Sequence, residues 1–278
     1  MEYVNPSEHV YLDDIERREE GGTPDIVGSI RAGLVFQLKE AVGSELIRQR
    51  EESFTTRALS RWQDHPAIEI LGSHDLPRLS IVSFVLRHEG RYLHHNFVVA
   101  LLNDLFGIQA RGGCSCAGPY GHRLLGIDIE TSHEFAQQIA LGCEGIKPGW
   151  VRVNVNYFLS EEVFAFILDA VELVAAEGWK LLPWYRFDAA TGLWHHADGL
   201  PEAPMSLASV HYVDGALTGD THRHHAPESA LPGYLEEART LLRDLPAPPP
   251  PEDPTGPAGE AFERLRWFWL PGELPIPR

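Results

Sequence analysis

The sequence predicts an α/β protein in which helices cover a mostly antiparallel or mixed sheet. Short β-branched segments are bounded by Gly, Pro and Asp, as strands are. Longer apolar segments repeat at helical spacing, begin at capping residues and end at glycine. The two kinds of segment interleave as far as about residue 180, which favours one sheet with helices packed on it. Beyond that point the pattern weakens, and a loop-rich C-terminal extension is expected.

Two helices are predicted before the first strand. The segment 23–43 begins with Thr23 and Pro24, which suit an N-cap and a first turn, and Gly43 ends it. A second helix is expected over 44–62. The preceding residues are polar and read as a connector.

The middle of the chain alternates between strands and helices. Strands are predicted over 67–71 and 79–87, followed by an apolar helix over 96–107 that Gly107 ends. The segment 108–113 starts as a short strand and enters a glycine-rich loop. The glycine-rich loop is therefore expected at the end of a strand, at the edge of the sheet.

Further helices flank the last predicted strand. A helix over 131–142 takes Thr131 or Ser132 as its N-cap, and 150–158 alternates as a strand. A long helix over 160–179 is predicted to bury its apolar face.

The extension carries three recognisable segments. Residues 183–199 are typical of a hairpin or loop, and 246–257 form a Pro-rich linker. Residues 260–272 suggest a short docking helix, and the aromatic run 266–270 within them is expected to be either a small core patch or a docking site. The expected organisation is a connector over 1–22, a domain over 23–180, a loop-rich extension over 181–245, and a linker with a short tail over 246–278.

Composition excludes several classes of function. Acidic residues outnumber basic ones by 40 to 23, giving a formal charge of −17, which argues against binding to nucleic acids and to anionic membranes. There is no long apolar run and no signal-peptide pattern at the start. The three cysteines show no disulfide spacing. A cytoplasmic location is expected.

The segment RGGCSCAGPYGH, residues 111–122, carries the chemistry. Gly112 and Gly113 permit a positive φ or a close approach of the backbone to a ligand. Arg111, at a strand end, suits bidentate recognition of a carboxylate. Cys116 follows on a loop, where a nearby cation would lower the thiol pKa and favour a nucleophile. The alternative is that Cys114 and Cys116 are small buried apolar residues.

Metal binding is the third interpretation of this loop. A Cys-x-Cys site would need further ligands from Cys143, His122, His94 or His95, and no Cys-x-x-Cys pair supports it. The histidines of WHH (194–196) and THRHH (221–225) are expected in solvated loops, and His94 and His95 on the surface at a strand end. We therefore expect no metal site.

Two motifs together resemble the class V aminotransferases, which use pyridoxal 5'-phosphate. RGGCSCA resembles the Arg-x-Gly-x-x-Cys-Ala loop in the C-terminal small domain of cysteine desulfurases and selenocysteine lyases. RREEGGTPDIVGSIRAG (17–33) resembles the family's Arg-x-Glu-x-Gly-Thr-Pro segment. The resemblance covers about residues 10–180 and implies the small domain of a type I pyridoxal-phosphate enzyme.

The resemblance implies roles for three residues. Arg111 matches the arginine that binds the substrate α-carboxylate, and Cys116 matches the cysteine that attacks substrate sulfur and carries a persulfide. Thr23 matches a threonine that reaches the cofactor phosphate across a dimer. The implied partners are an amino-acid substrate and either a second copy or a separate N-terminal cofactor domain.

The chain departs from the family at the cofactor lysine. Lys39, Lys147 and Lys180 are its only lysines, and none stands in the family's Ser-x-His-Lys context. We therefore expect a C-terminal portion whose cofactor domain is missing, and expect this chain to be inactive alone. The expected function is part of a class V aminotransferase or cysteine desulfurase-like enzyme acting on an amino acid. The alternative is a non-catalytic remnant or assembly module that dimerises or docks with a separate cofactor domain.

Overall fold

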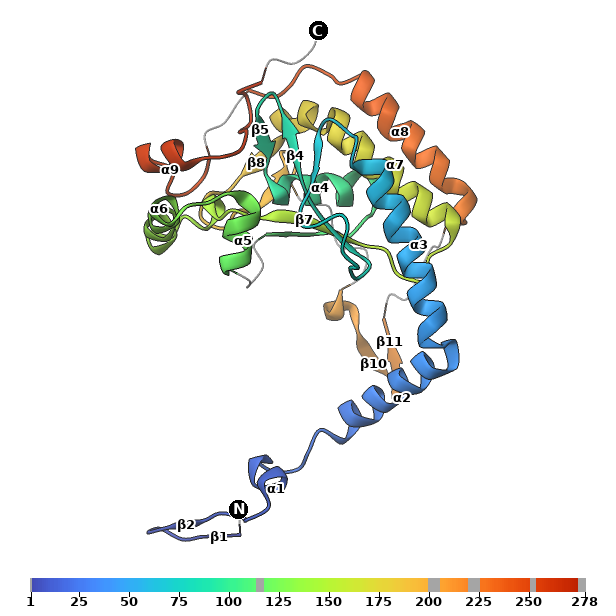
Figure 1. The fold of residues 1–278 in the computed structure, drawn as a ribbon, viewed down its shortest axis with the longest axis vertical. Helices are drawn as coiled ribbons and strands as arrows, with labels where there is room; N and C mark the ends of the chain where they lie inside the picture. The colour runs from blue at the N-terminus through green and yellow to red at the C-terminus, as the bar shows by residue number, and fades with distance from the viewer. Residues whose placement is uncertain (1, 114–117, 200–205, 220–225, 251–253, 275–278) are drawn as a thin grey trace. The chain divides into compact units, whose positions relative to one another are not determined.

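The computed structural model describes residues 2–113, 118–199, 206–219, 226–250 and 254–274 (Figure 1). These residues divide into two compact units, which meet within a long helix. Unit 1 comprises residues 1–50 and unit 2 comprises residues 51–278. The domain boundaries expected at 22, 180 and 245 stay predictions.

Unit 1 is built from local structure. A two-stranded ribbon pairs β1 (Tyr3–Val4) with β2 (His9–Val10), and the helices α1 (Ile15–Glu19) and α2 (Ile26–Val42) follow. The N-cap of α2 is Asp25, whose carboxylate accepts a hydrogen bond from the Gly28 amide at 2.8 Å. The prediction of Thr23 as N-cap was wrong, because the aspartate two residues later is placed to satisfy a free amide of the first turn. The next helix, α3 (Ser44–Trp62), begins here and continues into unit 2.

A five-stranded sheet forms the centre of unit 2. Its strands are β3 (Ile68–Ile70), β4 (Ile81–His88), β5 (Arg91–Leu93), β6 (Arg111–Gly113) and β7 (Trp150–Asn154). They run in the order β3-β4-β7-β6, with β5 also paired to β4. Every pair of these strands is antiparallel, which is one of the arrangements that the sequence left open.

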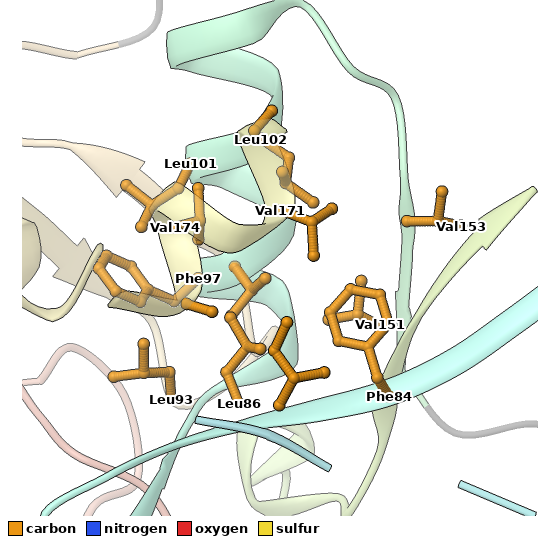
Figure 2. Close-up of a cluster of buried hydrophobic side chains, with 14 of the residues drawn as sticks. Phe84, Leu86, Leu93, Phe97, Leu101, Leu102, Val151, Val153, Val171 and Val174 are labelled. Carbon is orange, nitrogen blue, oxygen red and sulfur yellow. The ribbon is translucent and has the colours of Figure 1, made fainter. Parts of the chain in front are cut away.

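Helices cover this sheet, and the predicted α/β architecture is confirmed. The helices of unit 2 after α3 are α4 (His95–Phe106), α5 (Gly118–Leu125), α6 (Ile129–Ala140), α7 (Glu161–Glu177), α8 (Leu231–Arg243) and α9 (Glu260–Leu265). Figure 2 shows α4 and α7 facing the strands across the core, with Phe97, Leu101 and Val171 among the labelled side chains. Alternate residues of β7, Val151 and Val153, point into this core.

The caps of two helices show how well local signals locate an element. Gly107 ends α4 in the left-handed conformation, and the Ser160 hydroxyl caps α7, as the sequence predicts. The helix α6 begins earlier than predicted. Its N-cap is Asp128, whose carboxylate accepts from the Thr131 amide at 2.7 Å, so Thr131 and Ser132 lie inside the helix.

The segment after residue 180 shares the core of unit 2. The hairpin expected within 183–199 is present as β8 (Tyr185–Phe187) and β9 (Trp194–His196). A second hairpin joins β10 (His211–Val213) to β11 (Ala216–Thr218). The end of the Pro-rich linker is tied to the first hairpin, because the Ala189 amide donates to the Thr255 carbonyl at 2.7 Å.

The aromatic segment near the C-terminus lies in the core, which agrees with the first of the two roles expected for it, a core patch. Phe268 is fully buried, and the indole nitrogens of Trp267 and Trp269 donate to the carbonyls of Ile146 and His88. Arg266 is buried beside this segment between two glutamates and anchors it. The distal chain therefore closes over the edge of the sheet near β5.

Candidate functional site

Arg111 is the first residue of β6 and is exposed at the end of the sheet. Within the part of the chain that the structure describes, its guanidinium takes part in no hydrogen bond or ion pair. A charged side chain that no internal group neutralises remains available to a ligand. The structure therefore gives Arg111 the accessibility that carboxylate binding requires.

A second arginine stands directly opposite Arg111. The pairing of β6 with β7 places Arg152 across from Arg111, and β7 in turn places Ser83 of β4 across from Arg152. Directly opposed residues share one face, and this face is turned away from the core that contains Val151 and Val153. Sequence reasoning missed Arg152, because only the strand register reveals it.

The two glycines after Arg111 serve different purposes. Gly113 has a φ of +113°, a conformation that other residues rarely adopt. At Gly112 a Cβ atom would lie 2.6 Å from Asn96 Oδ1 and 3.1 Å from Val99 Cγ2, so this glycine lets β6 approach α4 closely. The close approach that the sequence predicted at Gly112 is therefore to a helix. This contact with α4 positions β6, the strand that carries Arg111.

His95 lies beneath this strand and is buried. Its Nε2 atom is 4.0 Å from the position of a Cβ atom on Gly113, and its ring stacks on Trp267 at 5.7 Å between centroids. Burial lowers the pKa of His95 to about 3, so the ring is neutral at physiological pH. Its Nδ1 atom has no hydrogen-bond partner among the described residues.

The expectation that His94 and His95 lie on the surface was wrong. His94 is 1% exposed, and its Nε2 lies 3.2 Å from the Gly145 carbonyl. Aromatic residues from the C-terminal segment cover both rings. The sequence around position 94 gives no sign of this cover. Neither ring faces solvent, and both pack in the core.

The remaining predicted site residues are placed only in part. Cys116 and Cys114 lie outside the described residues, as do 221–225. Beyond the loop, His122 holds the start of α5 to α6, with Nε2 2.7 Å from the Ser132 hydroxyl. Thr23 is exposed and belongs to unit 1. The roles of Cys116 and Thr23 stay predictions.

The lysines do not fit a covalent pyridoxal-phosphate site. Lys147 and Lys180 form ion pairs with Glu144 and Glu177. Lys39 lies in the last turn of α2. None of the three lines the cleft beside α4 and the β8–β9 hairpin or the one between α4, β7 and α7. That the cofactor lysine lies outside this chain stays a prediction.

No three His, Cys, Asp or Glu side chains among the described residues gather closely enough to bind a metal ion. No helix in the described ranges has both the length and the apolar character needed to cross a bilayer.

Comparison with known proteins agrees with the motif around Arg111. Residues 1–131 match the family model described as Aminotransferase class-V. Over these residues, the chain is similar to the class-V aminotransferase family. The part of this family segment that lies in unit 2 includes Arg111, α4 and the first strands of the sheet.

The class-V relatives include cysteine desulfurases. The chain is 33% identical to a cysteine desulfurase of Cronobacter sakazakii and 30% identical to one of Serratia proteamaculans, each over 102 residues. These matches cover 37% of this chain and 23% of each relative. An apo cysteine desulfurase structure from Thermococcus onnurineus NA1 aligns with a TM-score of 0.44 at 26% identity, covering 57% of this chain and 33% of that one. The chain therefore spans less than a quarter of the length of the two curated relatives.

Proposed function

We propose that this chain supplies the substrate-binding part of a pyridoxal-phosphate-dependent enzyme that acts on an amino acid. The supporting observation is Arg111, an exposed arginine of β6 that forms no hydrogen bond or ion pair among the described residues, with Arg152 of β7 as its partner in the strand register. An α-carboxylate bound to Arg111 would accept bidentate hydrogen bonds from its guanidinium group. The sheet and Gly112 fix the position of Arg111, so the bound amino acid would be held in one orientation.

The cofactor lysine comes from another polypeptide segment in this proposal. Pyridoxal phosphate, when bound, supplies an electron sink for bond cleavage at the amino acid, and the protein supplies binding and orientation. This chain contributes the carboxylate site through Arg111, and Thr23 is proposed to contact the cofactor phosphate. Cys116 is proposed as the sulfur-accepting nucleophile if the reaction is a desulfuration.

The surface of α2 supports the need for a partner. Seven large apolar side chains of this helix are exposed, and none of its residues is buried (Ile26, Val27, Ile30, Leu34, Val35, Phe36 and Leu38). A helix that is apolar on every side is normally surrounded by protein. We propose that the cofactor-bearing segment covers α2, with a second copy of this chain as the other candidate.

Co-expression tests the proposal. The chain is produced with the polypeptide encoded immediately upstream of Met1, and release of sulfide and keto acid is assayed from cysteine and alanine. We expect activity only when both are present. A complex that forms but releases neither product would contradict the proposal.

A Cys116→Ser variant then separates the two chemistries. Loss of sulfide release with keto-acid formation intact would support the nucleophile role of Cys116. Unchanged sulfide release would exclude it.

Covalent trapping tests the source of the lysine. The chain alone is mixed with stoichiometric pyridoxal phosphate, reduced with borohydride and digested for mass spectrometry. We expect no adduct on Lys39, Lys147 or Lys180 beyond that formed by the denatured chain. A single stoichiometric adduct on one of them would show that this chain holds the cofactor itself.

The second candidate function is a non-catalytic assembly module, and the ion-paired lysines favour it. Such a module would bind its partner through α2 without changing the partner's turnover. Equal turnover of the cofactor-bearing partner with and without this chain would support that alternative.

A further inference from the structure

A large cleft lies in unit 2 between α4, the β8–β9 hairpin and the segment that follows α8. Its volume is about 1310 Å³, above the roughly 300–1,000 Å³ usual for small-molecule sites. Asn96, Val99 and Asn103 of α4 form one wall, and Trp184, Tyr185 and Trp194 contribute to the opposite side. Arg111 is not among its lining residues, although Ala110, the residue before it, is.

The charges of the cleft have one sign. Asp104 and Asp198 supply two carboxylates, and no lysine or arginine is among the described residues that line it. His195 and His196 add polar edges. An anionic ligand would meet repulsion without a compensating cation, whereas a cation would gain favourable Coulomb energy.

Asp104 is exposed, and two neighbouring side chains donate hydrogen bonds to its carboxylate. Tyr185 donates its hydroxyl proton to Asp104 Oδ2 at 2.7 Å, and Asn103 Nδ2 donates to Oδ1 at 2.9 Å. Burial and the neighbouring carboxylate raise the pKa of Tyr185, so the phenol keeps its proton at physiological pH. A carboxylate held in this way is already oriented for a ligand and loses little freedom on binding.

The rest of the lining is apolar. Leu181, Leu193, Leu241 and Leu245 lie around the cleft, and Leu193 and Leu241 remain exposed there. A ligand that covers them would gain about 25 cal/mol for each Å² of apolar surface removed from water. The ligand is therefore expected to combine an apolar body with a positive charge.

We propose that this cleft binds a small organic amine with an aromatic or aliphatic body, and that Asp104 binds its ammonium group. Asp198, at the rim, adds a weaker attraction because its side chain is 91% exposed. The amine is a different ligand from the amino acid proposed for Arg111, since an amino acid would bring a carboxylate into an acidic cleft.

Three probes of one shape test the proposal. The full chain is titrated by calorimetry with 4-phenylbutylamine, its N-acetyl derivative and 4-phenylbutyrate, which are cationic, neutral and anionic. We expect the amine to bind at least about tenfold more tightly than the acid, with the neutral compound between them. Equal affinities, or no binding of the amine, would overturn the proposal.

Matched variants locate the charge. Asp104→Asn should weaken binding of the amine by about tenfold and leave the neutral probe nearly unchanged. Asp64→Asn removes an exposed carboxylate outside the cleft and should change neither affinity. Tyr185→Phe keeps the ring but removes the hydrogen bond to Asp104, and should weaken binding of the amine several-fold. If Asp64→Asn weakens the amine as much as Asp104→Asn does, the attraction is only that of the overall negative charge and the site is refuted.

Discussion

Helices α2 and α4 are both rich in aliphatic and aromatic residues, yet only α4 has a place in a core. Phe97, Leu101 and Leu102 of α4 are fully buried, whereas Leu34 and Phe36 of α2 are exposed by more than half. Strands β4, β6 and β7 and helix α7 surround α4 (Figures 1 and 2). No described residue of unit 1 buries any side chain of α2.

The difference between α2 and α4 shows which structural features an apolar sequence pattern can predict and which it cannot. An apolar repeat at helical spacing predicts a helix and the need for a cover. The identity of the cover depends on residues far away in sequence, or on another chain. For α4 the cover is present in unit 2, and for α2 we propose a partner.

Truncating one leucine in each helix should give the largest contrast. Leu101→Ala is expected to lower the free energy of unfolding by about 2–5 kcal/mol, because it leaves a cavity in the core. Leu34→Ala should change it by less than about 0.5 kcal/mol, since the side chain is exposed. Urea denaturation of the full chain measures both values. Comparable losses in the two variants would show that α2 is packed within this chain.

Adding a methyl group should also affect the two regions differently, lowering stability next to α4 and raising it in α2. Gly112→Ala forces β6 against Asn96 of α4 and is expected to cost about 1–3 kcal/mol. Gly33→Ala, in the middle of α2, meets no atom within 4 Å and should stabilise the helix by about 0.5–1 kcal/mol. Thermal unfolding, with circular dichroism as the probe, detects both shifts. A destabilising Gly33→Ala would indicate that a neighbour already covers α2.

Acid should destabilise the α4 region, where His95 is buried at the first turn. The pKa of His95 is lowered to about 3, so the folded state favours the neutral ring while the unfolded state takes up a proton as the pH falls through its ordinary value. Stability is therefore complete above that value and is lost on acidification. Between pH 7 and 5.5 His95 should account for about 1 kcal/mol.

Urea titrations at the two pH values measure this loss. His95→Gln should reduce the difference between them, whereas His211→Gln, which removes an exposed histidine of β10, should not. An unchanged pH difference in His95→Gln would mean that His95 is not the group responsible.

Local signals predicted much of the fold. Capping residues and periodicity located α3, α4 and α7 within about two residues. The helices α5 and α8 and the β10–β11 hairpin were missed. In α8 the sequence begins Leu-Pro-Gly, and Gly233 weakens the helical signal that the later residues carry.

The candidate site was predicted less completely. Arg111 could be proposed from the sequence because the motif around it is local, and its role stays a prediction. Arg152 was not found, since its position depends on the register between β6 and β7. The burial of His94 and His95 was also missed, because Trp267 and Phe268, which cover them, come from the far end of the chain.

Substitution of Arg111 in the active complex is the most direct test of the proposed carboxylate site. For Arg111→Gln we expect kcat/KM for the amino acid to fall by about ten- to a hundredfold, mainly through a higher KM, because one charge-assisted contact is lost. Arg239→Gln, on the surface of α8, should leave kcat/KM unchanged. A kcat/KM for Arg111→Gln within twofold of the unmodified complex would contradict the assignment of this arginine to the substrate carboxylate.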